Sequence, residues 1–443
     1  MKVFKVLVVL VMLGVSVFFA VTYYKTFLVT EAEDDGVQTV LVEEKKEPAE
    51  QEKEPEEQVV EIKVPVFRTT LPRSAQIQTD GKINNVGGYS NEKAVASYKL
   101  GSAYYVVIEG ESDNCDISCA NQNIVVARFD ANLTLTDALT LRSTTPEKFL
   151  TSAIHDDGLF IVAQSGSAVS VYSVGLDLKV SRLSLNVNAE KAISYYTSSG
   201  VLLALFGTSY VYVYSIDSSL RINTELSFSN QGATSPVAVY KSGDFYLLAN
   251  GDSSAKAFRF SLEGVKEVIN LPFINDILPC KTGYILLSCR QKTTLNLYDY
   301  SFVLQNEYKF DASDKAKIFS TDNGYLLVTY GNNRQTFSYY LCKHFDVVSF
   351  DGVDYEGAEE ITDSFYIDGT LYFTALNRNG VNVYKYDCNS HRAEKWLCFK
   401  DATSCDTYFT ESGSTFVVST IRCVEEYTQN FGLSDVFIRR VEK

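Results

Sequence analysis

The sequence is poor in the residues and motifs on which many active sites depend. Its 443 residues include one tryptophan, two methionines and three histidines, and the histidines His155, His344 and His391 lie far apart along the chain. A Gly-x-Ser-x-Gly nucleophile motif, a glycine-rich phosphate-binding loop and a paired metal-ligand motif are all missing. We therefore assign no catalytic residue and expect neither a resident metal nor a cofactor.

Basic residues are also scarce relative to acidic ones. The chain has 40 Lys and Arg against 55 Asp and Glu, which gives a formal net charge of −15 at pH 7. Nucleic-acid binding requires a basic stripe that displaces the counterions of the phosphates. The sequence has no such stripe, so nucleic acid is not an expected partner.

Apolar residues are plentiful. Hydrophobic residues make up 46% of the chain and aromatic residues 13%, nearly all of them Tyr and Phe. This composition is typical of many half-buried β-strands. It excludes a coiled coil and a generally disordered chain.

An apolar run near the amino terminus predicts a membrane anchor. It covers residues 6–24 and follows Lys2 and Lys5. A helix of about 19 residues spans ~29 Å, close to the hydrocarbon thickness of a bilayer, and the preceding lysines place the amino terminus in the cytoplasm. A cleaved secretory signal is the alternative. Under both interpretations the body is exported, and we expect a single-pass cell-membrane protein whose carboxyl-terminal body is extracytoplasmic.

The segment after this run predicts an extended linker. Residues 31–63 carry thirteen acidic and four basic residues, with Pro48 and Pro55 among them. Such a segment cannot bury enough apolar surface to offset the loss of chain entropy, although an acidic docking motif is an alternative. The chain thus divides into a cytoplasmic end (1–5), a transmembrane helix (6–24), an acidic disordered stalk (25–57) and a folded domain (58–443).

A repeated glycine followed by an apolar strand runs through the folded domain. The eight copies are at Gly101, Gly158, Gly200, Gly243, Gly283, Gly324, Gly369 and Gly413. The first interval is 57 residues, and the later ones are 42, 43, 40, 41, 45 and 44 residues. A fixed period in this range is typical of units that bury their apolar faces only by packing against one another.

Each unit contains four predicted strands, of which the second is the more apolar and the third carries an aromatic residue. The third-strand aromatics are Tyr172, Tyr214, Phe260, Tyr300, Tyr340, Tyr384 and Phe437. Four antiparallel strands per unit make one blade of an all-β propeller, in which radial repetition protects the sheet edges. Eight copies predict eight blades, with seven as the alternative.

The last unit is one strand short, which predicts that the other end of the chain closes the ring. Val59–Arg68 alternates apolar and polar residues, and Pro65 suits an outermost edge strand. We expect this segment to complete the last blade, so that the first and last blades become neighbours.

These units resemble the broad class of β-propeller repeat proteins, including exported quinoprotein-like and WD-like propellers, over residues 58–443. The resemblance concerns architecture and extends to no specific family. The Gly-His and Trp-Asp pairs of WD repeats and the paired glycines of kelch repeats are absent, and Trp396 alone cannot supply a docking tryptophan in every blade.

Two loops between second and third strands are longer than the others, and ring closure predicts that they stand side by side. They run from Glu109 to Asn123 in the first blade and from Arg422 to Leu433 in the last. Long loops on a rigid scaffold concentrate recognition. The candidate binding residues are Glu109, Glu111, Asp113, Asp116, Glu425, Glu426, Tyr427, Asn430 and Phe431. Surface decoration is one alternative interpretation, and a Ca²⁺ site at Asp113 and Asp116 is another.

Six of the nine cysteines are candidates for disulfides in an exported body, and the odd total leaves at least one unpaired. The candidate pairs are Cys115 with Cys119, Cys388 with Cys398, and Cys405 with Cys423. A zinc site at Cys388 and His391 with Cys398 and Cys405 is an alternative that has only one close ligand pair. Cys280, Cys289 and Cys342 lie in apolar strands and are expected to be buried free thiols.

The sequence therefore predicts a membrane-tethered, extracytoplasmic and noncatalytic propeller. Its expected partner is a protein or a glycan, held at the face that carries the two long loops. One alternative is a carbohydrate hydrolase or lyase that uses carboxylates facing the central channel. Another is a subunit of an envelope assembly complex.

Overall fold

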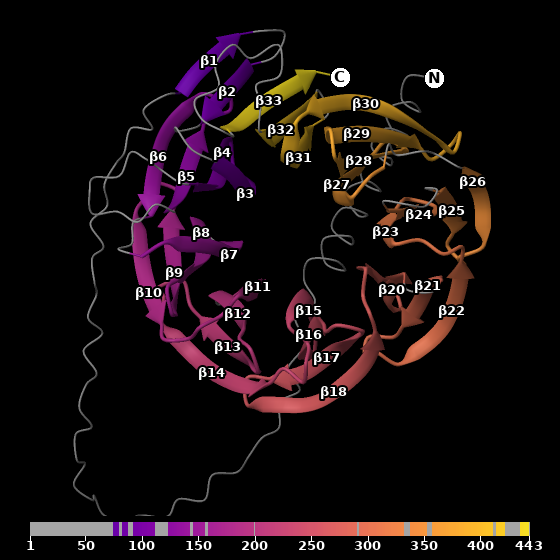
Figure 1. The fold of residues 1–443 in the computed structure, drawn as a ribbon, viewed down its shortest axis with the longest axis horizontal. Helices are drawn as coiled ribbons and strands as arrows, with labels where there is room; N and C mark the ends of the chain where they lie inside the picture. The colour runs from indigo at the N-terminus through magenta and orange to yellow at the C-terminus, as the bar shows by residue number, and fades with distance from the viewer. Residues whose placement is uncertain are drawn as a thin grey trace, which may run out of the picture. The chain divides into compact units, whose positions relative to one another are not determined.

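A computed structural model describes residues 74–78, 82–86, 92–110, 123–141, 145–155, 158–198, 200–289, 292–331, 337–351, 357–410, 413–420 and 435–442. All of them belong to one compact unit, Glu61–Lys443. The described residues form eight antiparallel sheets, here called blades, and contain no helix. The blades surround a common centre (Figure 1). The prediction of eight blades is confirmed.

Blades 1 to 4 each consist of four strands that are consecutive in the chain. Blade 1 comprises β3 (Glu92–Leu100), β4 (Ala103–Gly110), β5 (Asn123–Phe129) and β6 (Leu135–Leu141). Blade 2 comprises β7 (Glu147–His155), β8 (Gly158–Ser165), β9 (Ala168–Gly175) and β10 (Val180–Leu185). Blade 3 comprises β11 (Lys191–Thr197), β12 (Gly200–Phe206), β13 (Tyr210–Ile216) and β14 (Ile222–Ser229). Blade 4 comprises β15 (Ser235–Ser242), β16 (Asp244–Asn250), β17 (Ser254–Ser261) and β18 (Gly264–Pro272).

Blades 5 to 7 follow the same pattern, and blade 8 departs from it. Blade 5 comprises β19 (Asp276–Cys280), β20 (Gly283–Cys289), β21 (Thr293–Tyr298) and β22 (Leu304–Phe310). Blade 6 comprises β23 (Lys315–Ser320), β24 (Gly324–Tyr330), β25 (Phe337–Cys342) and β26 (Val347–Asp351). Blade 7 comprises β27 (Glu360–Ile367), β28 (Thr370–Asn377), β29 (Gly380–Asp387) and β30 (Arg392–Lys400). Blade 8 comprises β31 (Ala402–Thr410), β32 (Gly413–Thr420), β33 (Asp435–Glu442), β2 (Lys82–Val86) and β1 (Ser74–Gln78).

Within each blade the first strand lies toward the centre of the ring and the fourth lies outside (Figure 1). The second strand is the most buried, as in β12, where every residue from Gly200 to Phe206 is buried. Each glycine of the sequence repeat lies at or beside the turn between first and second strands. The third-strand aromatics are also placed correctly, except that Tyr300 follows β21, whose own aromatic residue is Tyr298.

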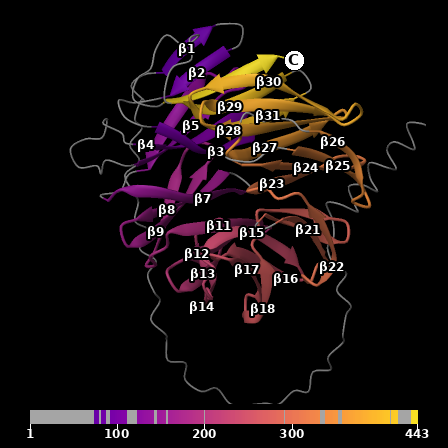
Figure 2. The same ribbon diagram turned by 45° about the vertical axis from the view of Figure 1, so that its right-hand side comes forward.

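The ring is closed by a strand from the amino-terminal side, as predicted, but not by the predicted segment. β2 pairs antiparallel with β33 from Ile83 opposite Arg439 to Val86 opposite Val436, and β1 pairs with the outer edge of β2 (Figure 2). The position expected for Val59–Arg68 is therefore held by β2, and Val59–Arg68 lies outside the described residues. Alternation in a sequence indicates that one face of a strand is buried, but it does not determine which edge the strand pairs with.

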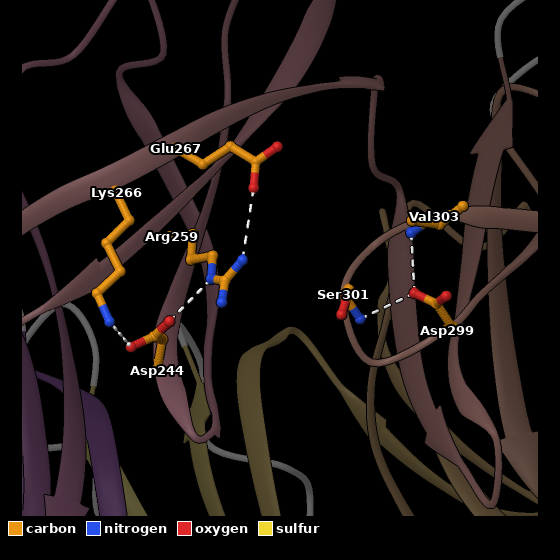
Figure 3. Close-up of polar contacts among 7 residues, drawn as sticks. All are labelled: Asp244, Arg259, Lys266, Glu267, Asp299, Ser301 and Val303. Carbon is orange, nitrogen blue, oxygen red and sulfur yellow. Dashed lines mark hydrogen bonds and ion pairs between the residues drawn. The ribbon is translucent and has the colours of Figure 1, made fainter.

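The turn between third and fourth strands, here called the outer turn, recurs with one geometry. In blade 5 the Oδ1 atom of Asp299 accepts hydrogen bonds from Ser301 N at 2.8 Å and Val303 N at 3.0 Å (Figure 3). Asp130 in blade 1 and Asp217 in blade 3 accept the same two bonds. An aspartate that bonds backbone N–H groups ahead of it stabilises a tight turn. The sequence signal is an Asp three residues before a Leu or Phe.

The fourth residue of the outer turn is a large apolar side chain that points inward, here called the plug residue. The plug residues are Leu133, Leu178, Leu220, Phe302 and Phe345, all with positive φ and at most 9% exposed. Each packs between its own blade and the preceding one, an interface called a seam below. Large residues rarely adopt positive φ, so burial of the side chain offsets the backbone strain.

Candidate functional site

Blades 1 and 8 are neighbours, so the strands from which the two long loops start lie in adjacent blades. The Oγ atom of Ser419 in β32 accepts a hydrogen bond from Ala94 N in β3 at 2.7 Å, and Ser404 Oγ in β31 donates to Ala94 O at 3.4 Å. The first loop leaves after Gly110 at the end of β4, and the second leaves after Thr420 at the end of β32. Both strands end on the same face of the ring, which we call the loop face. The opposite face carries the short glycine turns and the outer turns and is called the turn face.

A cavity of about 410 Å³ opens on the loop face beneath the starting points of these loops. Its lining comes from blades 1, 2, 7 and 8 and includes Lys93, Glu109, Phe149, Glu360, Thr362 and Ser404. The lining therefore combines a cation, carboxylates, hydroxyl groups and one aromatic ring. Such a set can form hydrogen bonds and ion pairs with polar ligands and pack against an apolar group.

Glu109 is the one predicted binding residue that the structure describes. It lies inside β4, one residue before the strand ends, and it lines the cavity. Its Oε1 atom accepts a hydrogen bond from Phe149 N in blade 2 at 3.0 Å. The same kind of bond joins Ser419 to Ala94, and in blade 5 the Oδ2 atom of Asp276 accepts from Ile318 N at 2.9 Å. Glu109 thus joins two blades, and a role in ligand binding stays a prediction.

The other predicted binding residues lie outside the described residues. They are Glu111, Asp113, Asp116, Glu425, Glu426, Tyr427, Asn430 and Phe431. The strands that flank the two loops lie in neighbouring blades, whereas the position and the contacts of the loop residues stay predictions. Sequence reasoning missed the lining residues Lys93, Glu360 and Thr362, because they lie at the starts of inner strands and carry no motif.

Comparison with known proteins identifies the fold class of the chain. No protein-family model and no curated protein sequence matches the chain. The Dos1 propeller aligns with a TM-score of 0.52 at 12% identity, over 80% of this chain and 95% of that chain. This chain is a β-propeller. Dihydro-heme d1 dehydrogenase NirN in complex with DHE aligns with a TM-score of 0.50 at 11% identity, over 75% of this chain and 76% of that chain.

BamB from Moraxella catarrhalis is a more distant match, with a TM-score of 0.41 at 10% identity over 71% of this chain and 96% of that chain. Identities this low show the fold alone. The propeller fold supports a binding or scaffold module, and the identity of the ligand has to come from the site.

Among the described carboxyl groups, burial raises the pKa of Glu147, Asp276 and Asp406 above its ordinary value. They lie in blades 2, 5 and 8, and each accepts hydrogen bonds from protein groups. Tyr172 OH donates to Glu147, Lys317 Nζ lies 3.0 Å from Asp276 Oδ1, and Ser97 Oγ donates to Asp406. Glycoside hydrolysis requires two carboxyl groups flanking one bond, whereas these three stabilise separate blades and seams.

The buried carboxyl group of Glu147 predicts a dependence of stability on pH. Burial raises its pKa, while the hydrogen bond from Tyr172 and the charge of Arg182 lower it. Because the folded-state pKa exceeds the unfolded one, the folded chain binds more protons between these two values, and stability falls as the pH rises through that window. In Glu147→Gln we expect a free energy of unfolding on the order of 1 kcal/mol higher than in the wild type at pH 8.

The measurement for Glu147→Gln is urea unfolding at pH 4, 6 and 8. The gain should shrink as the pH falls toward the unfolded-state pKa. Asp177→Asn is the control, because hydrogen bonds from Lys179 lower the pKa of Asp177, so this variant should gain no stability at pH 8. A Glu147→Gln variant less stable than the wild type at all three pH values would contradict the assignment.

Cys280, Cys289, Cys342, Cys388 and Cys398 are free thiols. Cys280, Cys289, Cys342, Cys388, Cys398 and Cys405 form no disulfide with one another. The predicted pairing of Cys388 with Cys398 is wrong, because the register of β29 and β30 places Cys398 opposite Asn382 and Asp387 opposite Arg392. Only Cys289 of the three expected buried thiols is fully buried, and burial raises its pKa to about 11.

Other cysteine and metal predictions fall partly outside the described residues. Cys115, Cys119 and Cys423 are outside them, so their pairings stay predictions. Among the residues with described side chains, no group of three or more His, Cys, Asp or Glu could hold a metal ion. The described part of the chain also holds no helix that is long and apolar enough to cross a bilayer, and residues 6–24 lie outside it.

A charge cluster on the turn face of blade 4 has a structural explanation. Asp244 Oδ2 lies 2.8 Å from Arg259 Nε, and its Oδ1 lies 2.6 Å from Lys266 Nζ (Figure 3). Arg259 Nη1 in turn lies 3.7 Å from Glu267 Oε2. These residues come from β16, β17 and β18, so the cluster joins three strands of one blade.

Proposed function

We propose that this propeller is a membrane-tethered, extracytoplasmic and noncatalytic module that binds a protein or a glycan chain at its loop face. The observation that carries this proposal is the cavity of about 410 Å³ on the loop face, which is lined by residues of blades 1, 2, 7 and 8. A cavity with polar lining next to adaptable loops on a rigid ring is a common arrangement for recognition.

The tether is inferred from the amino-terminal sequence. Residues 6–24 are long and apolar enough for a transmembrane helix, and the acidic residues that follow would extend by mutual repulsion. A tethered body of this kind meets its partner close to the membrane and on its outer side. Tethering also raises the local concentration of the binding site at the cell surface.

The polar lining of the cavity supports the proposal that the partner is a macromolecule. Lys93, Glu360 and Thr362 present a cation, a carboxylate and a hydroxyl group within one lining. A peptide or sugar chain that enters the cavity could pair with these groups, while the loops contact its flanking parts. The carbohydrate-active enzyme stays the second hypothesis from the sequence, and the envelope assembly subunit the third.

Changes to the loops should abolish capture of the partner, and changes to the cavity should weaken it. The test uses full-length chain on intact cells, a membrane-impermeant crosslinker and quantification of crosslinked species. Deletion of residues 111–122 together with shortening of 425–432 should eliminate the crosslinked product. The double charge swap Lys93→Glu with Glu360→Lys should weaken capture about tenfold.

The matched control is the swap Lys281→Glu with Glu263→Lys, which preserves net charge and changes the turn face. This control should capture the partner like the wild type. Capture that survives both loop changes would refute the loop-face site. Turnover of a glycan substrate that is lost on a single Asp or Glu replacement would favour the enzyme hypothesis instead.

A further inference from the structure

The exposed apolar side chains of the described residues are concentrated on the turn face. Thirteen large apolar residues of the described chain are between 37% and 57% exposed. Twelve of them lie at or within three residues of a turn on the turn face, whereas Tyr210 begins β13 on the loop face. Scattered exposed apolar residues are normal in any protein. The informative feature is therefore their restriction to one face of the ring.

Nine of these twelve residues lie at outer turns, and together they are called the apolar arc. The other three lie near the ends of first strands, closer to the centre of the ring (Figure 1). The arc runs without interruption through blades 2, 3, 4, 5 and 6. Its members are Leu176, Ile222, Leu262, Val265, Tyr300, Val303, Leu304, Val347 and Val348.

The geometry of the outer turn does not require an apolar residue at these positions. The residue after the plug residue donates its N–H to the turn aspartate in blades 1, 3 and 5, and it is Thr134, Arg221 and Val303, respectively. The same turn therefore forms with a polar or charged residue at this position. Val303 is nevertheless apolar and 57% exposed (Figure 3). The stability of the blade does not explain this exposed valine.

The exposed apolar area is large enough for a stable interface between proteins. Large side chains have ~150–250 Å² of surface each, so the twelve residues together expose on the order of 1,000 Å². A standard interface buries ~800 Å² on each partner. The largest apolar patch of a typical monomer covers ~300–600 Å². The turn face thus exposes as much apolar surface as one partner of a stable dimer buries.

The width of the arc favours a second copy of this chain as the partner. A partner narrower than the ring would contact the turns of one or two blades and leave the rest of the arc exposed. A second copy has a ring of the same width and carries the same arc. A two-fold axis over blade 4, the middle of the arc, places blade 2 over blade 6 and blade 3 over blade 5 of the other copy. Two-fold dimers in which one surface meets itself are the commonest homo-oligomers.

The charges of the turn face are compatible with this arrangement. Blade 2 exposes Asp177 and Lys179 at its outer turn, and blade 6 exposes Lys343 and Asp346 at its own. When blade 2 of one copy meets blade 6 of the other, each charge has one of opposite sign available. Blade 4, which meets itself, exposes Lys241 and Glu263. Complementary charges of this kind set the register of an interface rather than its affinity.

A lipid surface fits the turn face less well than a protein does. Membrane-binding surfaces place Lys and Arg beside their apolar residues. The outer turns along the arc instead contain aspartates, at Asp177, Asp217 and Asp299. Carboxylates at these positions would be repelled by anionic lipids. A protein surface that supplies both apolar groups and charges of both signs is therefore the better occupant.

We propose that the turn face is a self-association surface through which two copies of this chain form a two-fold dimer. The apolar arcs of the two copies face each other, and blade 4 lies on the symmetry axis. The loop faces then point away from each other, so the loop-face cavity of each copy stays accessible. The proposal concerns the face opposite that cavity and does not depend on what the cavity binds.

The test is sedimentation equilibrium of the full-length chain in detergent micelles that are matched to the solvent density. We expect a monomer–dimer equilibrium with a dissociation constant in the micromolar range or below. The arc variant is Val303→Glu with Val348→Glu, two positions that are 57% and 55% exposed. It should raise the dissociation constant about tenfold or more, because the new carboxylates lose water at the interface.

Two further variants make the result specific. Val303→Gln with Val348→Gln removes the apolar groups without adding charge, and it should also weaken the dimer. Tyr210→Glu is the matched control, because Tyr210 is 52% exposed but lies on the loop face. This control should dimerise like the wild type. Thermal unfolding of each variant confirms that the propeller is folded.

Three outcomes would overturn the proposal. The first is a chain that stays monomeric throughout the micromolar range. The second is a dimer that neither arc variant weakens, because association would then occur through another part of the chain. The third is a dimer that Tyr210→Glu weakens as much as the arc variants do. In cell extracts, a crosslinked product with a different protein that the arc variants abolish, without any product of two copies, would assign the arc to that protein instead.

Discussion

Replacement of Phe302 by alanine is expected to lower the free energy of unfolding by about 3–5 kcal/mol. Phe302 is 3% exposed, and its ring stacks on Tyr284 at 4.7 Å and contacts Tyr246 at 5.2 Å. The alanine variant loses these contacts and leaves a cavity in the seam between blades 4 and 5. The backbone strain stays, since φ at this position is 60° and alanine tolerates positive φ poorly.

The measurement for Phe302→Ala is equilibrium unfolding in urea. Val303→Ala is the matched control, because Val303 is the next residue of the same turn but is 57% exposed. The control should change stability by less than about 0.5 kcal/mol. Equal losses in both variants would mean that outer turns do not hold the blades together.

Replacement of Gly283 by alanine is expected to cost about 3 kcal/mol or more, because strain and overpacking combine. Gly283 has a φ of 147°, and a Cβ atom there would lie 2.0 Å from Tyr298 O in the neighbouring strand. That carbonyl belongs to the backbone of β21, so it could move only if the pairing of β20 with β21 were distorted. The side chain cannot be accommodated by a rotamer change.

The control for Gly283→Ala is Gly243→Ala, at the equivalent turn of the preceding blade. Gly243 has a φ of 70°, and a Cβ atom there would have no neighbour within 4 Å. We expect a loss of about 1–2 kcal/mol from the backbone conformation alone. Thermal unfolding of both variants separates the cost of the steric clash at position 283 from the cost of the backbone conformation alone at position 243. A Gly243→Ala variant that loses as much stability as Gly283→Ala would contradict the steric argument.

The blade repeat could be predicted because its signal is local. Each turn between first and second strands places a glycine within two residues of the start of the apolar second strand. At Gly200 and Gly283 the positive φ explains the residue type. The buried second strand, such as Gly283–Cys289, is recognisable in the sequence as an apolar run. Local constraints of this kind produce the same sequence pattern in every blade.

The closing strand could not be predicted because its sequence shows only weak alternation of apolar and polar residues. β2 has the sequence Lys-Ile-Asn-Asn-Val, whereas Val59–Arg68 has the stronger alternation. Pairing with β33 is a contact between segments distant in sequence, and alternation does not encode a partner. The cysteine prediction failed for a related reason, because the distance between Cys388 and Cys398 depends on the register of β29 and β30.

The candidate site is formed by contacts between blades, and the sequence of one blade does not predict these contacts. Glu109 was identified from its position beside a long loop, but its bond to Phe149 N becomes visible only when blades 1 and 2 are packed together. The Asp-x-x-Leu or Asp-x-x-Phe pattern at Asp130, Asp217 and Asp299 is present in the sequence and is a local signal for three of the outer turns.

The pairing of β2 with β33 affects how the chain can fold during synthesis. β2 leaves the ribosome before any complete blade, and β33 is the last of the described strands to leave it. Blades 1 to 7 join consecutive strands and can form as they emerge, but blade 8 has to wait for both of its distant parts. Until then the edge of β2 is exposed, and a nascent chain held open at this point could pair with a neighbouring chain on the same polysome.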